Sequence, residues 1–135
     1  MPFTPPAVSA LTGGILIIMQ MALMLAVVLA RRRNRQSLGD GGSPDMLLAI
    51  RRHGNFAENA ALFIAGFALL EVMDGSRPAL EIMCAIFVLG RISHAIGLSM
   101  PKTVNRFRIV GIAATIGGGV VLGVRLIRVA LPLLG

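Results

Sequence analysis

The feature that most constrains the fold is a run of 24 residues, from Ala7 to Ala30, that contains no charged side chain. About 20 mainly apolar residues are enough for an α-helix to cross the hydrocarbon core of a bilayer. No basic residue precedes the run, and it is longer than the apolar part of a signal peptide, so we expect a membrane-spanning helix and not a cleaved leader. The abundance of Leu, Met and Ala in this run favours a helix over a strand.

The composition of the whole chain agrees with a membrane protein. Of its 135 residues, 56% are hydrophobic and 14% are charged, and the mean hydropathy is +0.82, whereas soluble domains average about 25% charged residues. The alternating segments of about ten residues that are typical of a membrane barrel are not visible. Four apolar spans fit the pattern, at about residues 8–33, 45–72, 78–98 and 104–131. The sequence therefore predicts one domain, an all-α integral membrane four-helix bundle.

The connections between the spans carry turn and capping signals. Residues 34–44 are rich in Gly, Ser and Asp, as is typical of a loop. Either Ser43 or Asp45 is placed to cap the second helix, with Pro44 near its first turn. In the fourth span, the three consecutive glycines at 117–119 would allow close contact with a neighbouring helix.

The basic residues are distributed unevenly around the spans. If the helices alternate in direction, nine basic residues fall at one membrane face and three at the other, with Arg91 inside the third helix. The richer face is expected in the cytoplasm and both termini on the opposite side. The nine are Arg31, Arg32, Arg33, Arg35, Arg51, Arg52, Lys102, Arg106 and Arg108; the three are Arg77, Arg125 and Arg128.

The net charge of +7 raises the question of a nucleic-acid partner. The chain has no Trp and no Tyr on which bases could stack, and its arginines flank apolar spans, so we expect no such partner. The arginines at residues 31–35 are explained most simply as topology signals and anchors to anionic lipid. Likewise, Arg52 and His53 are expected to face the headgroups.

Three polar residues of the second span point most directly to a function. Arg51, Asn55 and Glu58 are spaced i, i+4, i+7, which places them on one face of a helix. A charge in the hydrocarbon region costs at least about 3 kcal/mol, so such groups must meet one another, water or a polar ligand. In the third span, Arg91 and His94 are spaced i, i+3 and so also share a face.

Further arginines belong to the same half of the membrane. Arg31 ends the first span, and Arg106 and Arg108 open the fourth. A pocket between these polar faces, within one subunit or with a neighbouring subunit, would prefer an anionic ligand that carries amides, because guanidinium groups bind carboxylates through two parallel hydrogen bonds. The alternative is a structural network that joins the helices. The two roles are compatible.

Two other reactive residue types are not expected to form a site. Cys84 is the only cysteine, so no intrachain disulfide can form, and we expect it to be a small buried hydrophobe. His53 and His94 have neither a cysteine nor a second histidine at the spacing of metal ligands. The sequence therefore predicts no metal site.

The polar motifs resemble those of a known family. Arg51-x-x-x-Asn55-x-x-Glu58, followed by an apolar run that ends at Glu71, looks like the second-helix signature of the MAPEG proteins, the membrane-associated proteins of eicosanoid and glutathione metabolism. Residues 90–97, Gly-Arg-Ile-Ser-His-Ala-Ile-Gly, are similar to their third-helix motif, and residues 105–108 fall where the family has the arginine that opens its fourth helix. The resemblance extends from the first helix to residue 128 and fits the bacterial, microsomal glutathione transferase-like type.

The resemblance implies a homotrimer that binds glutathione between neighbouring subunits, near the cytoplasmic face. By position, Arg51, Asn55 and Glu58 would hold the carboxylates, the amide and the amino group of glutathione. The full set of residues that match binding positions is Arg31, Arg51, Asn55, Glu58, Arg91 and His94.

The fourth-helix arginine of the family is held to stabilise the glutathione thiolate. A nearby cation lowers the pKa of a thiol from about 8.5 toward neutrality, and the thiolate is the nucleophile. Here the matching residue is Arg108 or Arg106, with Arg108 better spaced from Gly111. Many family members have a proline three or four residues after the glutamate, where this chain has Ala61 and Leu62. Eicosanoid-type members also often have a tyrosine near position 98, and this chain has no Tyr.

The leading hypothesis is a membrane glutathione transferase or peroxidase that conjugates or reduces lipophilic electrophiles from the bilayer. The alternative is a non-catalytic member that binds lipid or glutathione as a scaffold. A small multidrug transporter ranks last, because such antiporters need a membrane-embedded acid in the first helix and the first span offers only Gln20.

Overall fold

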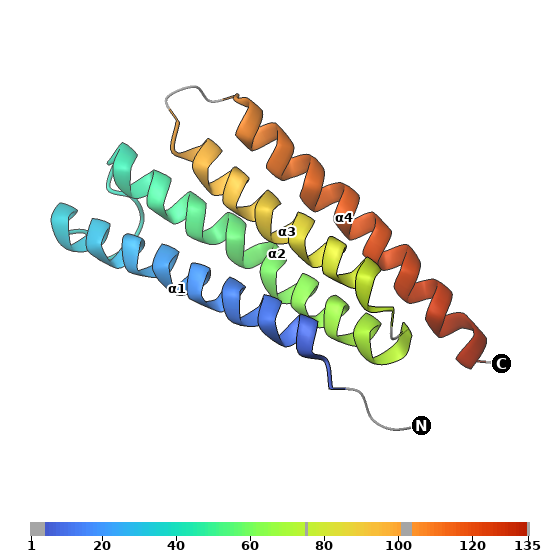
Figure 1. Cartoon of the computed structure of the whole chain (residues 1–135). Coiled ribbons are helices and arrows are strands. Elements are labelled where there is room, and N and C mark those ends of the chain that lie inside the picture. Colours follow the sequence, from blue (N-terminus) through green and yellow to red (C-terminus); the bar gives the residue numbers. More distant parts are fainter. Residues whose placement is uncertain (1–4, 75, 101–103, 135) are drawn as a thin grey trace.

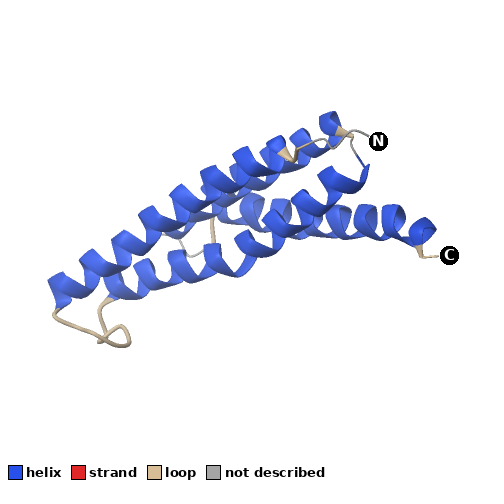
Figure 2. Cartoon of the chain, turned by 90° about the horizontal axis from the view of Figure 1, so that it is seen from below, coloured by secondary structure: helices blue, strands red, loops and turns tan. Residues whose placement is uncertain are grey.

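The computed structural model describes residues 5–74, 76–100 and 104–134. Four α-helices run alternately up and down, so that both termini lie at one end of the bundle (the termini end) and the α1–α2 and α3–α4 connections at the other (the loop end; Figure 1). Figure 2 shows that the loops are confined to the ends of the helices. The prediction of an all-α four-helix bundle is confirmed. The elements are α1 (Ala7–Asn34), α2 (Pro44–Asp74), α3 (Arg77–Leu98), α4 (Arg106–Ala130) and the short 3-10 helix η1 (Leu131–Leu133).

All four helices are long and apolar enough to cross a membrane. At 1.5 Å per residue, the 22 residues of α3 span about 33 Å and the 31 residues of α2 about 46 Å, compared with a hydrocarbon core of about 30 Å. Large apolar side chains such as Leu11, Ile18 and Leu62 are each about 70% exposed on the outside of the bundle. So much exposed apolar surface requires lipid or neighbouring subunits to cover it.

The C-terminal end of α1 and the start of α2 follow from local capping. The hydroxyl of Ser43 accepts a hydrogen bond from the backbone N–H of Met46 at 3.4 Å, and Pro44 is the first residue of α2, as the sequence predicted for this helix start. α1 ends at Asn34 because Arg35 adopts the left-handed conformation, with φ 50°.

Asn105 determines where α4 begins. Its side-chain oxygen accepts a hydrogen bond from the backbone N–H of Arg108 at 3.0 Å, so the helix starts at Arg106, two residues later than the predicted boundary at 104. The amide nitrogen of Asn105 donates to the carbonyl of Gly97 at 2.7 Å. One side chain therefore caps α4 and ties its start to the end of α3.

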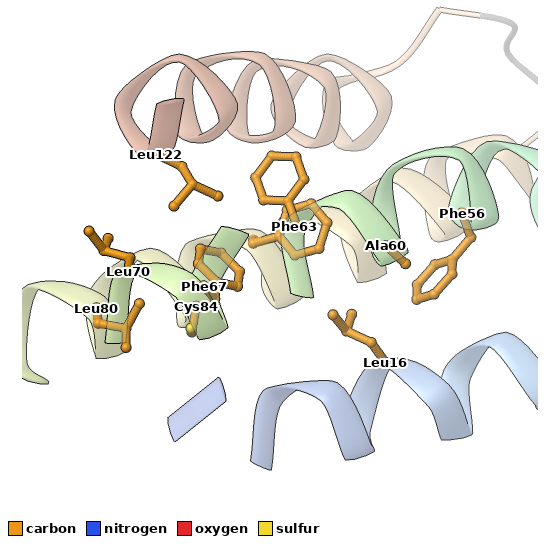
Figure 3. Close-up of a cluster of buried hydrophobic side chains, with 10 residues drawn as sticks. Leu16, Phe56, Ala60, Phe63, Phe67, Leu70, Leu80, Cys84 and Leu122 are labelled. Carbon is orange, nitrogen blue, oxygen red and sulfur yellow. The ribbon is translucent and has the colours of Figure 1, made fainter. Parts of the chain in front are cut away.

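The apolar core is centred on three phenylalanines (Figure 3). The rings of Phe63 and Phe87 stack with centroids 3.8 Å apart, and Phe67 meets both edge-on at 5.7 and 5.9 Å. Cys84 is buried beside them, which confirms its predicted role as a small core residue. α2 contributes half of the buried residues of this cluster and contacts each of the other three helices.

The closest approach between helices is at glycines of α3 and α4. A Cβ atom added to Gly111 would lie 2.6 Å from the Cβ of His94 and 2.7 Å from the carbonyl oxygen of Gly90. A Cβ added to Gly90 would lie 2.7 Å from the Cβ of Ala114. Side chains essentially never come so close, so these small residues set the distance between α3 and α4.

The glycine triplet of α4 plays a smaller part than the sequence predicted. Gly119 and Gly118 pack against the ring of Phe63, where an added Cβ would lie 3.2 and 3.8 Å from ring atoms. Gly117 has no atom within 4 Å of such a Cβ. The prediction of close contact is therefore wrong for Gly117 within this chain, because that position points away from the bundle.

Glu71 holds the first turn of α1 from the far end of α2. Its two carboxylate oxygens accept hydrogen bonds from the backbone N–H groups of Val8, at 3.0 Å, and Ser9, at 2.8 Å. The first N–H groups of a helix have no partner within it, and the helix dipole favours a negative charge there. Glu71 is 7% exposed, so a buried carboxylate supplies the cap that the residues before α1 lack.

The α3–α4 contact predicts that Gly111→Ala destabilises the protein by about 1–3 kcal/mol, because the added methyl group must displace His94 or the backbone of Gly90. Gly117→Ala is the matched control in the same helix, and it should leave stability unchanged or raise it by up to about 1 kcal/mol. Thermal unfolding of the purified variants in detergent measures both. Equal melting temperatures for the two variants would show that the close approach is absent.

The buried cap predicts that Glu71→Ala destabilises α1 by about 1–3 kcal/mol, since two backbone N–H groups lose their acceptor. Glu71→Gln keeps one carbonyl oxygen as an acceptor, so its stability should lie between those of Glu71→Ala and the wild type. Glu81→Ala, which alters an exposed acid on α3, is the control. Hydrogen exchange should become faster at the start of α1 in Glu71→Ala and remain unchanged in Glu81→Ala; unchanged exchange in both would refute the cap.

Candidate functional site

Arg91 joins three helices from a fully buried position. Its side chain is 2% exposed. One terminal nitrogen donates to the carbonyl of Asn55 in α2 at 2.9 Å, and the other to the hydroxyl of Thr115 in α4 at 3.3 Å. The guanidinium carbon lies 5.6 Å from the ring centre of Phe56, within the range of a cation–π contact. A single cation thus fixes α2, α3 and α4 relative to one another.

A cavity of about 190 Å³ opens next to Arg91. Asn55 is eleven residues into α2, which at 1.5 Å per residue places the cavity about 16 Å from the start of that helix, within the membrane half nearer the loop end. Polar groups from α2, α3 and α4 face the cavity, and two exposed isoleucines of α4 border it. The lining residues are Asn55, Asn59, Arg91, His94, Ile112, Thr115 and Ile116.

His94 and Arg91 bring unpaired polar atoms to this cavity. The imidazole of His94 is 4% exposed and lies beside the first turn of α4. Neither of its ring nitrogens, nor the Nε atom of Arg91, has a hydrogen-bond partner in the described part of the chain. Buried polar groups in folded proteins are nearly always paired. The unpaired nitrogens therefore mark a place that needs a polar ligand or ordered water.

Arg51 and Glu58 lie on the outside of the bundle. Both side chains are exposed, on the same face of α2 as Asn55. The charge of Glu58 nevertheless acts on Arg91, so the two are near each other. The structure thus brings Asn55, Arg91 and His94 together and leaves Arg51 and Glu58 at the outer edge of the same region.

Of the two candidate arginines of α4, Arg108 lies on the face that lines the cavity. Ile112 and Thr115, both cavity residues, follow Arg108 at i+4 and i+7, so all three share one side of the helix. Arg106 is exposed, and Val110 at i+4 from it is exposed as well. Helix geometry therefore favours Arg108, which is half-buried about one turn closer to the loop end than the cavity.

Arg31 lies in the last turn of α1 and does not line the cavity. Its guanidinium donates to the carbonyls of Ser37 at 2.7 Å and Gly39 at 3.3 Å, which closes the connection between α1 and α2. Its role in ligand binding stays a prediction that involves a neighbouring subunit. Of the other basic residues expected at this end, Lys102 lies outside the described residues.

The expectation that His53 faces the headgroups is wrong. One ring nitrogen lies 2.7 Å from the amide nitrogen of Gln20, so His53 pairs with α1 inside the bundle. Two polar residues in otherwise apolar helices satisfy each other across the α1–α2 interface, which is less costly than exposing either to lipid.

Two cavity residues, Asn59 and Thr115, were not identified from the sequence. Asn59 follows Asn55 by four residues in an apolar helix, a spacing that could have revealed it. Thr115 carried a weaker signal, because a hydroxyl can bond to the carbonyl four residues earlier in its own helix, as Thr115 also does with Gly111 at 2.9 Å. Among the described residues, no group of three or more His, Cys, Asp and Glu side chains could hold a metal ion.

The chain is similar in sequence to known membrane proteins. The Inner membrane protein YecN of Escherichia coli strain K12 is 33% identical to the chain over 109 residues, which cover 80% of this chain and 81% of YecN. The Inner membrane protein YecN of Escherichia coli O6:H1 (strain CFT073) gives the same values. Together with four helices able to span a bilayer, these relatives identify a multi-pass membrane protein. A sequence model of the MAPEG family matches residues 9–128, which include every polar residue of the site, and the chain therefore belongs to the MAPEG family.

Proposed function

We propose that this protein is a membrane glutathione transferase or peroxidase, which uses the thiolate of glutathione to conjugate or reduce lipophilic electrophiles. The observation that carries the proposal is the buried guanidinium of Arg91 beside a polar cavity in an apolar bundle. Such a site favours an anionic ligand with amides, and glutathione combines two carboxylates, two peptide bonds, an ammonium and a thiol. Membership of the MAPEG family supports the same ligand.

The outer residues suit the zwitterionic end of glutathione. An exposed guanidinium on Arg51 can bind the γ-glutamyl carboxylate, and the carboxylate of Glu58 can bind its ammonium group. Because these side chains lie on the outside of one chain, a neighbouring subunit of a homotrimer would complete the site, with Arg31 of that neighbour among the contacts. The excess of arginine at the loop end supports a cytoplasmic location for this face, from which glutathione would enter.

Arg108 is the residue that we propose stabilises the thiolate. In conjugation with an aryl halide, the thiol of glutathione first releases its proton to water. The sulfur then attacks the ring carbon that carries the halogen. A carbon–sulfur bond forms, and the halide leaves with its bonding electrons. In peroxide reduction, the sulfur attacks the terminal peroxide oxygen and the alcohol leaves; a second glutathione then displaces water and forms glutathione disulfide. The electrophile would come from the bilayer past Ile112 and Ile116, which border the cavity.

A second candidate is binding without turnover. Arg108 is not among the residues that line the cavity, so the polar pocket can hold a ligand without an arginine of α4 at the thiol. A scaffold that binds glutathione or lipid would need no more than this. A proton-coupled transporter has less support, because the carboxylate of Glu71 is occupied by the backbone of α1.

The proposal predicts that the purified protein conjugates 1-chloro-2,4-dinitrobenzene with glutathione and binds glutathione directly. Arg51→Ala and Glu58→Ala should each weaken glutathione binding about tenfold or more, because each removes a charge-assisted hydrogen bond. Arg108→Ala should lower kcat more than it weakens binding. Calorimetry and absorbance assays measure these quantities.

Arg32→Ala is the matched control, since it removes an exposed arginine of α1 that is outside the motif. It should leave binding and conjugation at the wild-type level. Glutathione binding without conjugation would favour the scaffold. If a well-folded protein shows neither binding nor conjugation, the proposed function is wrong.

A further inference from the structure

We infer that a groove between α1 and α3, in the half of the bundle nearer the termini end, binds one phospholipid whose headgroup carries a primary ammonium, that is, a phosphatidylethanolamine. The groove shares no lining residue with the cavity beside Arg91. The inference therefore does not depend on the function proposed above.

The groove is large, and its wall is mainly apolar. Its volume is about 470 Å³. Two of the lining side chains, Leu11 and Leu89, are 69% and 64% exposed. Thr12 also lines it, but the hydroxyl of Thr12 donates to the carbonyl of Val8 at 2.8 Å, so it needs no other partner. A methylene group is about as large as a water molecule, which occupies about 30 Å³ in the liquid, so the groove has room for an acyl chain.

The groove lies at the depth of an acyl chain. α1 and α3 both begin at the termini end (Figure 1). At 1.5 Å per residue, the groove residues of α3 extend from Glu81, about 6 Å from the start of the helix, to Leu89, about 18 Å from it. Glu81 is the only charged side chain among the described residues of the wall. The groove thus carries a charge near the membrane boundary and apolar side chains toward the middle of the bundle, which is the order of polarity in a phospholipid.

Glu81 selects a headgroup with an ammonium. Its side chain is exposed, and the only ion pair among the described residues joins Arg125 to Asp74. A charge at the edge of the hydrocarbon region is costly unless it meets a partner. Helix side chains lean toward the N-terminus of the helix, so the carboxylate of Glu81 is directed to the headgroup layer. A lipid ammonium in that layer can donate a charge-assisted hydrogen bond to it.

Arg77 makes a zwitterionic headgroup the best match. Arg77 precedes Glu81 by four residues, so the two side chains share one face of α3. It is exposed and forms no ion pair with Glu81. A guanidinium binds a phosphate through two parallel hydrogen bonds. Because ethanolamine is a short link between phosphate and ammonium, one headgroup can meet both side chains.

The test titrates three lipids with the same acyl chains into the full-length protein in detergent, and native mass spectrometry counts the lipids bound. Dioleoyl phosphatidylethanolamine has N–H donors, the phosphatidylcholine has a quaternary ammonium without them, and the phosphatidylglycerol has no cation. The wild type should bind the first about tenfold more tightly than either of the others, the ratio expected from one charge-assisted hydrogen bond. This comparison needs no variant, so it does not depend on the folding of a mutant.

Variants then locate the headgroup. Glu81→Gln keeps the size of the side chain and removes its charge, so it should bind the ethanolamine and choline lipids equally. Asp45→Asn, which neutralises an exposed acid at the start of α2, is the matched control and should preserve the ratio. Arg77→Gln should weaken the binding of all three lipids, because each contains the phosphate, and leave the ratio between the ethanolamine and choline lipids unchanged.

A phosphatidylethanolamine with a diazirine in its acyl chain locates the chain. Irradiation should attach it to both helices, within residues 8–15 and 81–89. Ala85 lines the groove, so Ala85→Phe should reduce this labelling severalfold. Ala10→Phe places the same ring at an exposed position of α1 outside the groove and should leave the labelling unchanged.

Four results would overturn the inference. Equal binding of the three lipids by the wild type would mean that the headgroup is not recognised, and a preference for phosphatidylglycerol would assign the site to Arg77 alone. A preference for phosphatidylethanolamine that persists in Glu81→Gln would place the ammonium at another carboxylate. Cross-links between the α3 helices of two copies, with no lipid attached to α1 or α3, would show that a second copy of the chain covers the groove.

Discussion

The burial of one guanidinium group is the constraint on which the arrangement of α2, α3 and α4 depends. The hydrocarbon core of a bilayer offers no water to hydrogen-bond, so N–H groups buried at that depth need acceptors within the protein or in a cavity. The N–H groups of Arg91 find a carbonyl on α2 and a hydroxyl on α4, at 2.9 and 3.3 Å. Sliding either helix by one residue, about 1.5 Å, would break a bond to a buried cation. The axial register of three helices is thus coupled to a single side chain.

The small residues of α3 and α4 make this contact possible. Gly90 and Gly111 let the two backbones approach so closely that an added methyl group would collide with its neighbour. A larger residue at either position would push α4 outward and carry Thr115 away from Arg91. The glycines and the polar cluster therefore act together, because the first set the distance that the second requires.

Acids of α2 perform a similar task at the termini end. Glu71 binds the first turn of α1, and Asp74 pairs with Arg125 of α4. α2, like α3, contacts each of the other helices, and its polar bonds hold α1 and α4 in place at this end. This division leaves the middle of the bundle to the stacked phenylalanines, which pack without directional bonds.

The sequence was informative where the signal lies within one helix and less so where two distant segments meet. Apolar length predicted the four spans, and the spacing of Asn55, Arg91 and His94 predicted that they face a common region. The cap of α1 by Glu71 could not be found in this way, because 62 residues separate the acid from Ser9. The position of the closest helix contact was also hidden, since a glycine shows only that close approach is allowed and not which helix approaches.

The heights of the charged residues along the helices suggest how binding and chemistry are related. Arg51 precedes the cavity residue Asn55 by one turn of α2, and Arg108 precedes Ile112 by one turn of α4, so both arginines lie about 5 Å nearer the loop end than the cavity. Under the proposed function, the buried Arg91 of α3 would bind the anionic ligand, and the half-buried Arg108 of α4 would stabilise its thiolate. Because the two roles belong to different helices, a chain of this family can lose the second role and still retain the first.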